Sequence, residues 1–320
     1  MIISSTAPLK KVMDNSLRAR VLMILEEGYG IAAKKIFPVR GGIINTNFRI
    51  ATASGDFLLK VYNLRTREQA EFEIGAFERL AQKNFPCPRP LRAADGGRTA
   101  DFGGKPAVLF HYIPGAPLTL ITPERLYEVG RGVACLHKTL RRHPQAVVRD
   151  EWEPEDIGRF IRTQSATIIR KRFPGAKNFV RFIEKEFSTL KLPSGLPSGL
   201  THQDIKPDNI IVAPDGICHI IDFDNMYRGV LLYDMMTTII WTCFPGTRFS
   251  LKRFEAFMRG YERERRLTNV ERRAVPEALR FRLLREAFVW PMRFSPRVAR
   301  RNAAHFIASY RHLPRDFFHA

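Results

Sequence analysis

Hydrophobic and polar positions toward the amino terminus of the chain mainly indicate strands. Short apolar or alternating runs, separated by turn residues such as those around Gly55, predict strands at 35–39, 47–52, 57–62 and 106–112. Two helical patterns accompany them. The first follows the capping residues Asp14 to Ser16 and ends by Gly30, and the second covers 66–83 and is stopped by prolines.

Helical periodicity dominates from about residue 123 onward. Helices are predicted near 123–141, 177–190, 229–243, 250–264, 271–289 and 296–311. One interruption is β-rich, because the runs 209–212 and 217–221 flank a Pro-Asp-Gly turn and predict a hairpin. We therefore expect an α+β protein with a strand-rich lobe at 1–112, including a loose tail at 1–13, and a helical lobe at 113–320.

The predicted hairpin places three polar side chains together. Asp204 and Asn209 lie at the two ends of one short loop, and the hairpin returns the chain so that Asp222 lies beside them. Phosphoryl transfer requires a carboxylate that orients the attacking hydroxyl and accepts its proton, and oxygen ligands that hold Mg²⁺. Asp204 is the candidate base, and Asn209 and Asp222 are the candidate Mg²⁺ ligands. The alternative, turn residues and a strand cap, requires the whole pattern to have arisen by chance.

The segment from His202 to Asn209, followed by Ile221-Asp222-Phe223-Asp224, resembles the aminoglycoside/choline-type phosphotransferase family, and Leu231-Leu232-Tyr233-Asp234 is similar to that family's helix start. Within the family, the chain looks closest to homoserine kinases of the second type. The resemblance implies a protein-kinase-like two-lobed fold and an ATP-dependent small-molecule kinase that phosphorylates a hydroxyl group. A protein substrate is disfavoured, because no Asp-Phe-Gly segment or Ala-Pro-Glu loop ending is present.

The resemblance also implies a nucleotide site in the strand-rich lobe. Gly41, Gly42 and Asn45 match a phosphate-facing loop, and Lys60 matches the strand lysine that reaches the α- and β-phosphates of ATP. Such a lysine requires a carboxylate partner on the following helix. Periodicity selects Glu73, which shares the apolar stripe of that helix and therefore needs a buried cation.

Further positions receive narrower expectations from the resemblance. His111 and Tyr112 match a hinge whose backbone amides meet the adenine edge. Lys206 departs from the family pattern and is similar to a lysine of many protein kinases that meets the transferring phosphate, which implies that it neutralises charge at the γ-phosphate, although a solvated loop lysine is an equal alternative. Gln203 departs from the family pattern, which has glycine at this position. His202 and His137 are interpreted as a support of the loop and a packing residue.

Charge narrows the class of acceptor. The chain has 52 Lys and Arg against 32 Asp and Glu, for a formal net charge of +20. Such a surplus repels polycations such as aminoglycosides and attracts an anionic acceptor, with Arg228, Arg282 or Arg285 as candidate clamps. Nucleic acid is disfavoured, because no recognition motif accompanies the charge. Choline, ethanolamine, sugar and aminoglycoside kinases stay open as alternatives, as does a catalytically silent nucleotide-binding module.

The cysteines and the apolar runs indicate in which cellular compartment the protein is expected. The four cysteines are far apart and have no metal-ligand spacing, which fits a reducing environment. The start of the chain has no apolar leader, and the run 235–244 is half the length of a membrane span. We expect a cytoplasmic protein without a membrane span, and the oligomeric state is left open.

Overall fold

The computed structural model describes residues 13–39, 44–143, 153–171, 175–293, 295–314 and 317–318. Contacts divide the chain into two compact units. We call Ser5–Ala116 with Ile211–Ile221 the sheet unit, and Pro117–Ile210 with Asp222–Ala320 the helical unit. The lobe boundary expected between residues 112 and 113 stays a prediction.

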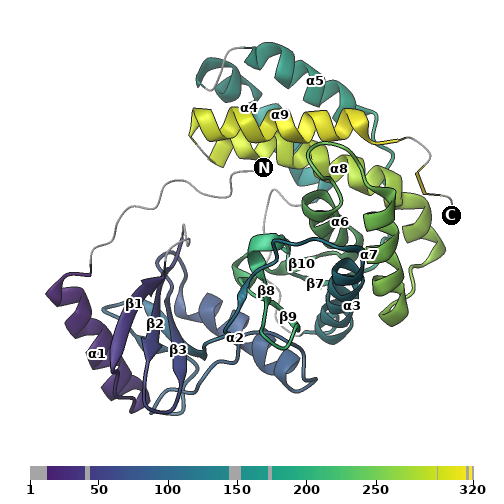
Figure 1. Ribbon diagram of the computed structural model, residues 1–320. Coiled ribbons are helices and arrows are strands. Elements are labelled where there is room, and N and C mark those ends of the chain that lie inside the picture. Colours follow the sequence, from purple (N-terminus) through teal and green to yellow (C-terminus); the bar gives the residue numbers. More distant parts are fainter. Residues whose placement is uncertain are drawn as a thin grey trace. The chain divides into compact units, whose positions relative to one another are not determined.

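The sheet unit is built on five antiparallel strands in the order β1-β2-β3-β5-β4 (Figure 1). Their bounds are β1 Lys35–Val39, β2 Thr46–Ala51, β3 Asp56–Val61, β4 Ala100–Asp101 and β5 Pro106–His111. The hairpin between β2 and β3 turns at Gly55, which has φ +131° and so occupies a conformation that suits glycine. The strands at 35–39, 47–52, 57–62 and 106–112 are thus confirmed to within a residue.

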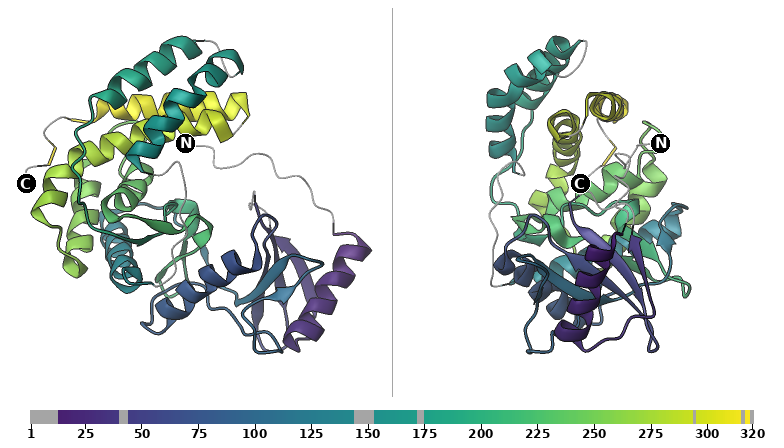
Figure 2. Two further views of the ribbon diagram at one scale, coloured as in Figure 1. Left: turned by 180° about the vertical axis from the view of Figure 1, so that it is seen from behind. Right: turned by 90° about the vertical axis from the view of Figure 1, so that its left-hand side faces the viewer.

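The two faces of the sheet are covered by different helices (Figure 2). Side chains alternate along β3, so Phe57, Leu59 and Val61 share one face and pack with α1, Asn15–Tyr29. The opposite face includes Phe110 of β5, whose ring meets Phe77 of α2, Arg67–Ala81, edge to face at 5.5 Å.

The start of α2 is fixed by its local sequence. Thr66 accepts a hydrogen bond from Gln69 N, and the Gln69 side chain accepts one from Thr66 N, which completes a capping box.

The strands β8, Ile210–Val212, and β9, Cys218–Ile220, form a small sheet with β6, Ala116–Pro117. The hairpin predicted at 209–221 is therefore confirmed.

The described residues of the helical unit form mostly helices and a two-stranded ladder (Figure 1). The helices are α3 Pro123–Leu140, α4 Pro154–Lys171, α5 Ala176–Ser188, α6 Leu231–Thr242, α7 Leu251–Glu264, α8 Asn269–Arg293 and α9 Pro296–His312. β7, Ser198–Thr201, pairs antiparallel with β10, Tyr227–Val230. This ladder brings the segment after β7 next to the start of α6, which follows β10 directly.

Two glycines allow α3 and α7 to approach closely. A Cβ added at Gly130 would lie 2.2 Å from the Phe257 carbonyl oxygen, and one added at Gly260 would lie 2.0 Å from the Tyr127 carbonyl oxygen. Backbone cannot move aside as a flexible side chain can, so these positions accept only glycine. The reciprocal contact fixes α7 against α3.

Two expectations for the helical unit need correction. The helix α4 was not predicted, because its buried positions Ile157, Ile161 and Ile168 share one face with Ser165 and Gly158, which weaken the apolar signal. The helix expected over 229–243 begins only at Leu231, since its first residues belong to β10. No helix among the described residues is both long and apolar enough to cross a membrane.

Candidate active site

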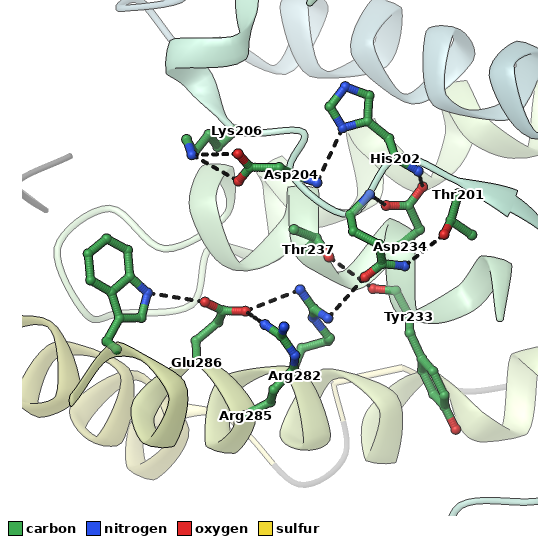
Figure 3. A network of polar contacts seen from close by, with 12 residues as sticks. Thr201, His202, Asp204, Lys206, Tyr233, Asp234, Thr237, Arg282, Arg285 and Glu286 are labelled. Atoms are coloured by element: carbon green, nitrogen blue, oxygen red, sulfur yellow. Dashed lines mark hydrogen bonds and ion pairs between the residues drawn. The ribbon is translucent and has the colours of Figure 1, made fainter. Parts of the chain in front are cut away.

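The loop after β7 is held by a buried carboxylate at the start of α6. Asp234 accepts hydrogen bonds from the backbone N–H groups of His202, at 2.8 Å, and of Gln203, at 2.6 Å. His137 Nε2 lies 2.9 Å from the same carboxylate, and its Nδ1 lies 2.7 Å from Tyr261 Oη. All of these side chains are buried. Asp234 therefore fixes the backbone immediately before Asp204 to the helical core (Figure 3).

His202 supports the loop from its other side. Its ring lies 4.5 Å from the ring of Phe223 and is fully buried. Its Nδ1 accepts a hydrogen bond from Asp204 N at 3.3 Å. With its Nδ1 engaged by the backbone, His202 positions the loop, as expected from the sequence. His137 also does more than pack, because it contacts Asp234.

The loop brings Asp204, Lys206 and Asn209 together. Lys206 Nζ donates to both Asp204 carboxylate oxygens, at 2.7 and 2.9 Å, so it is not the freely solvated lysine of the alternative interpretation. Asn209 Nδ2 donates to the Asp204 carbonyl oxygen at 2.8 Å and to its carboxylate at 2.9 Å. Asp204 is therefore oriented from both ends of the loop, while 19% of its side chain stays exposed to a reacting partner.

Burial and neighbouring charges shift the pKa values of both Asp204 and Lys206. Burial raises the pKa of Asp204, and the nearby Glu286 carboxylate raises it further, although Lys206 and Asn209 oppose the rise. Burial lowers the pKa of Lys206, but the Asp204 carboxylate more than compensates and the net shift is upward. Asp204 is thus a stronger base than an ordinary aspartate, next to a lysine that stays charged.

Asp222 lies at the end of the hairpin in a strained backbone conformation, with φ 65° and ψ 67°. Its charge raises the pKa of Lys206, so the two side chains are electrostatic neighbours. Because both partners of Asn209 Nδ2 are acceptors, the amide oxygen is the atom left to bind a cation. One amide oxygen and one carboxylate suit Mg²⁺. Among the described residues, no group of three or more His, Cys, Asp or Glu could hold a metal by itself.

Helix α8 contributes a charged cluster next to this loop (Figure 3). Glu286 Oε1 accepts hydrogen bonds from Arg282 Nη2, at 3.2 Å, and from Arg285 Nη1. Trp290 Nε1 donates to Glu286 Oε2 at 3.1 Å. Arg282 Nη1 donates to Gln203 Oε1 at 3.2 Å, which connects the cluster to the residue before Asp204.

Gln203 has φ +65°, the left-handed conformation. A residue with a Cβ loses about 1–2 kcal/mol there, so glycine would be easier to accommodate. The Gln203 side chain is buried, and its Nε2 donates to Thr201 Oγ1 at 3.1 Å. The departure from the family's glycine thus coincides with side-chain contacts that glycine lacks.

In the sheet unit, the predicted partners Lys60 and Glu73 are found together. Lys60 Nζ donates to Glu73 Oε1 at 2.8 Å, and both side chains are buried. The Lys60 ammonium also lies 4.6 Å from the centre of the Tyr62 ring. This confirms the choice of Glu73 by periodicity, whereas contact with a nucleotide stays a prediction.

The predicted phosphate-facing loop is described only in part. Gly41 and Gly42 lie outside the described residues, and Asn45 lies in the bend before β2. The carboxyl end of this loop is held by Asn63, whose Nδ2 donates to the Ile44 carbonyl oxygen at 2.9 Å.

The expectation that the backbone amides of His111 and Tyr112 meet the adenine edge needs adjustment. His111 N donates to the Arg89 carbonyl oxygen at 2.9 Å, and Tyr112 N donates to the Asp56 carbonyl oxygen at 3.0 Å. These two amides therefore already have hydrogen-bond partners within the sheet unit.

Three arginines were candidate clamps for an anionic acceptor. Arg228 donates to the His143 carbonyl oxygen at 2.9 Å, whereas Arg282 and Arg285 belong to the cluster on α8.

Three residues at the site were not predicted to act there: Asp234, Glu286 and Trp290. Asp234 is the lone carboxylate in a helix that is otherwise apolar or uncharged, and such a group requires partners. Glu286 follows Arg282 by four residues on a buried helix face. Both signals were visible in the sequence, but only the fold reveals which loop they contact.

Comparison with known proteins agrees with this geometry. The model of the Phosphotransferase enzyme family matches residues 35–273. A homoserine kinase of Xanthobacter autotrophicus is 31% identical over 273 residues, which cover 81% of this chain and 82% of that protein. A homoserine kinase of a Caulobacter species is 32% identical over 257 residues, which cover 77% and 78% of the two chains.

Solved structures show the fold. An amicoumacin kinase in complex with AMP-PNP aligns with a TM-score of 0.69 at 16% identity, over 95% of this chain and 99% of that chain. A microcompartment-associated aminopropanol kinase aligns with a TM-score of 0.67 at 20% identity, over 92% and 95%. The protein-kinase-like α+β fold expected from the sequence is confirmed.

Proposed function

We propose, from the premise that this chain belongs to the phosphotransferase enzyme family, that it phosphorylates the side-chain hydroxyl of homoserine. The chain is an ATP-dependent small-molecule kinase with a hydroxyl acceptor. The observation that carries the phosphotransfer role is the Asp204 carboxylate, which Asn209 and Lys206 orient in the loop after β7. The two homoserine kinases that match most of the chain support the acceptor.

In the proposed reaction, the acceptor hydroxyl donates a hydrogen bond to Asp204 and transfers its proton to that carboxylate. The hydroxyl oxygen forms a bond to the γ-phosphorus of ATP while the bond to the β–γ bridging oxygen breaks and ADP leaves. Lys206, one hydrogen bond from Asp204, stays charged and balances the negative charge of the transferred group. The raised pKa of Asp204 favours proton transfer in the forward direction.

Two further groups are proposed to hold the nucleotide. Lys60, oriented by Glu73, binds the phosphates of ATP. Asn209 Oδ1 and the Asp222 carboxylate would hold Mg²⁺, which would neutralise charge on the phosphates of ATP. Asn209 and Asp222 thus supply oxygen ligands for the metal, and Lys60 supplies a positive charge for the phosphates, as phosphoryl transfer requires.

The acceptor is proposed to be a small anion-bearing alcohol. A formal net charge of +20 repels polycations such as aminoglycosides, and also the choline cation, whereas homoserine is a zwitterion without net charge near neutral pH and is not repelled. Long-range repulsion of this kind weakens with ionic strength. We therefore expect added salt to change the apparent second-order rate constant for homoserine little.

An acceptor screen tests the proposal. ATP consumption is measured with homoserine, choline, ethanolamine, methylthioribose, amino sugars and aminoglycosides at matched concentrations. We expect the highest kcat/KM with homoserine. A higher kcat/KM for choline or an aminoglycoside would contradict the proposed acceptor, and failure of ATP with Mg²⁺ to raise the unfolding temperature would contradict nucleotide binding.

A further inference from the structure

Gln203, the residue before Asp204, has a backbone conformation that opposes its own side chain. Its φ of +65° lies in the left-handed region, where a Cβ meets steric resistance and glycine does not. The Gln203 side chain is also buried, at 2% exposed, so its amide is removed from water and requires hydrogen-bond partners. A buried polar side chain at a strained position indicates that its contacts have a purpose.

Both ends of the Gln203 amide have partners, and these partners belong to different elements. Gln203 Nε2 donates to Thr201 Oγ1 in β7 at 3.1 Å, and the same hydroxyl donates to the Tyr227 carbonyl oxygen in β10 at 2.9 Å. Gln203 Oε1 accepts from Arg282 Nη1 at 3.2 Å. Arg282 projects from α8 toward the loop (Figure 3). The side chain of Gln203 therefore connects the β7–β10 ladder with α8.

The backbone of Gln203 is held by a third element. Gln203 N donates to Asp234 Oδ1 in α6 at 2.6 Å. The direction of the Asp204 side chain follows from the backbone dihedral angles at positions 203 and 204, because the peptide between them is planar. Restraining Gln203 therefore restrains the direction in which the Asp204 carboxylate points.

The other contacts of the Asp204 carboxylate come from within its own loop. Lys206 Nζ and Asn209 Nδ2 both donate to this carboxylate. A displacement of the whole loop would carry these two donors along with Asp204. Gln203 is instead attached to β7 and α8, so its side chain fixes the base relative to the rest of the helical unit.

We propose that Gln203 is a positioning residue for phosphoryl transfer, whose side-chain amide fixes Asp204 to β7 and α8 and so aims the carboxylate at the acceptor hydroxyl. The inference rests on the proposed role of Asp204 as the base, and it does not depend on the identity of the acceptor. Misplacing a reacting group by about 1 Å can slow a reaction by about 100-fold. Loss of the amide contacts should therefore slow the chemical step.

The test measures phosphoryl transfer in a single turnover by rapid quench, with the acceptor that wild type phosphorylates fastest. Gln203→Gly removes both amide contacts and relieves the left-handed strain, so we expect it to fold. Gln203→Met keeps the length of the side chain and removes its hydrogen bonds. Both variants should transfer the phosphoryl group about 10- to 100-fold more slowly than wild type. The KM for ATP should stay within about twofold, because the proposed phosphate ligand Lys60 lies in the sheet unit.

Variants at two other positions serve as controls. Asn84 is exposed, lies in the sheet unit and has φ +53°, so Asn84→Gly relieves the same kind of strain and should leave the transfer rate unchanged. Thr201→Val removes the acceptor of Gln203 Nε2 and should slow transfer about 3- to 10-fold, whereas Thr201→Ser keeps the hydroxyl and should stay within about twofold of wild type. Added to Gln203→Gly, Thr201→Val should cause little further loss, because it acts through the Gln203 side chain.

The outcomes separate a positioning role from a purely structural one. Slow transfer in the Gln203 variants and in Thr201→Val, with Thr201→Ser and Asn84→Gly near wild type, supports the proposal. Transfer by Gln203→Gly at the wild-type rate overturns it, even if the unfolding temperature falls, and leaves the role of Asp204 standing. An equal loss in Asn84→Gly also overturns it. If Asp204→Asn keeps the wild-type rate, the role of Asp204 falls, and this inference falls with it.

Discussion

Replacing Asp234 by asparagine should loosen the catalytic loop without touching any reacting group. Asp234 Oδ2 accepts hydrogen bonds from His202 N and faces His137 Nε2, while Oδ1 accepts from Gln203 N. An asparagine has one acceptor oxygen and one donor NH₂. If its oxygen takes the Oδ2 position, Gln203 N then faces a donor and loses its partner.

The magnitude follows from these contacts. A hydrogen bond to a charged group contributes about 1.5–3 kcal/mol, and a buried donor left unpaired costs about 1–3 kcal/mol. The bonds kept by the new amide are also weaker, because the negative charge is gone. Some relaxation of the loop offsets part of the loss. We expect Asp234→Asn to lower the free energy of unfolding by about 2–4 kcal/mol.

Urea unfolding of wild type, Asp234→Asn and Asp208→Asn measures this change. Asp208 is exposed in the same loop, so its variant should stay within about 0.5 kcal/mol of wild type. The Asp234 variant should also lose kcat, because the backbone before Asp204 shifts. Equal unfolding free energies and equal kcat values in wild type and Asp234→Asn would refute the anchoring role.

The pH dependence supplies a second readout. Burial raises the pKa of Asp234, but hydrogen bonds from His137 and the His202 amide lower it more, and the net pKa is below the usual value. A lowered pKa in the folded state stabilises the fold above the pKa of the unfolded chain, about 3.9. That contribution is lost as pH falls through the folded pKa. The difference between wild type and Asp234→Asn should therefore be constant near neutrality and shrink in acid.

Three further predictions concern separate parts of the molecule. Glu73→Gln weakens the support of Lys60, so kcat/KM for ATP should fall about 10- to 100-fold in a steady-state assay. Activity needs ionised Asp204, so kcat should decline as pH falls through its raised pKa, and Glu286→Gln should move that decline to lower pH in a pH–rate profile. Gly260→Ala forces a Cβ into opposing backbone and should lower the unfolding free energy by about 3 kcal/mol in urea.

Matched controls accompany these variants. Glu71→Gln changes a half-buried carboxylate on the same helix as Glu73 and should leave kcat/KM for ATP within about twofold. Gly158→Ala places a Cβ 3.3 Å from the edge of the Phe187 ring, which can yield, and should cost less than Gly260→Ala. An equal loss in each pair would contradict the assigned contacts, as would a pH–rate profile that Glu286→Gln leaves in place.

The sequence predicts the site best where local pattern and chemistry coincide. Glu73 was selected because a carboxylate on an apolar helix stripe requires a cation, and Lys60 is that cation. Asp204, Asn209 and Lys206 are close in sequence, so one short loop brings them together. These contacts join residues that are close together in the sequence, so local patterns are enough to predict them.

Other features depend on packing that no local pattern records. Backbone hydrogen bonds leave no trace in side-chain identity, so the engaged amides of His111 and Tyr112 were not foreseen. The α8 cluster was visible as charges on a buried face, but its contact with Gln203 joins residues 79 positions apart. The start of α6 was placed too early because a short apolar run suits a strand and a helix alike.

The most direct test of the central claim is phosphoryl transfer by Asp204→Asn, measured with saturating ATP, Mg²⁺ and homoserine by detection of the phosphorylated product. Asparagine keeps the shape of the side chain but cannot accept the hydroxyl proton. We expect kcat to fall by about 10²–10⁴-fold while ATP still raises the unfolding temperature, with Asp208→Asn close to wild type. Product formation by Asp204→Asn at the wild-type rate would contradict the assignment of this loop as the phosphotransfer centre.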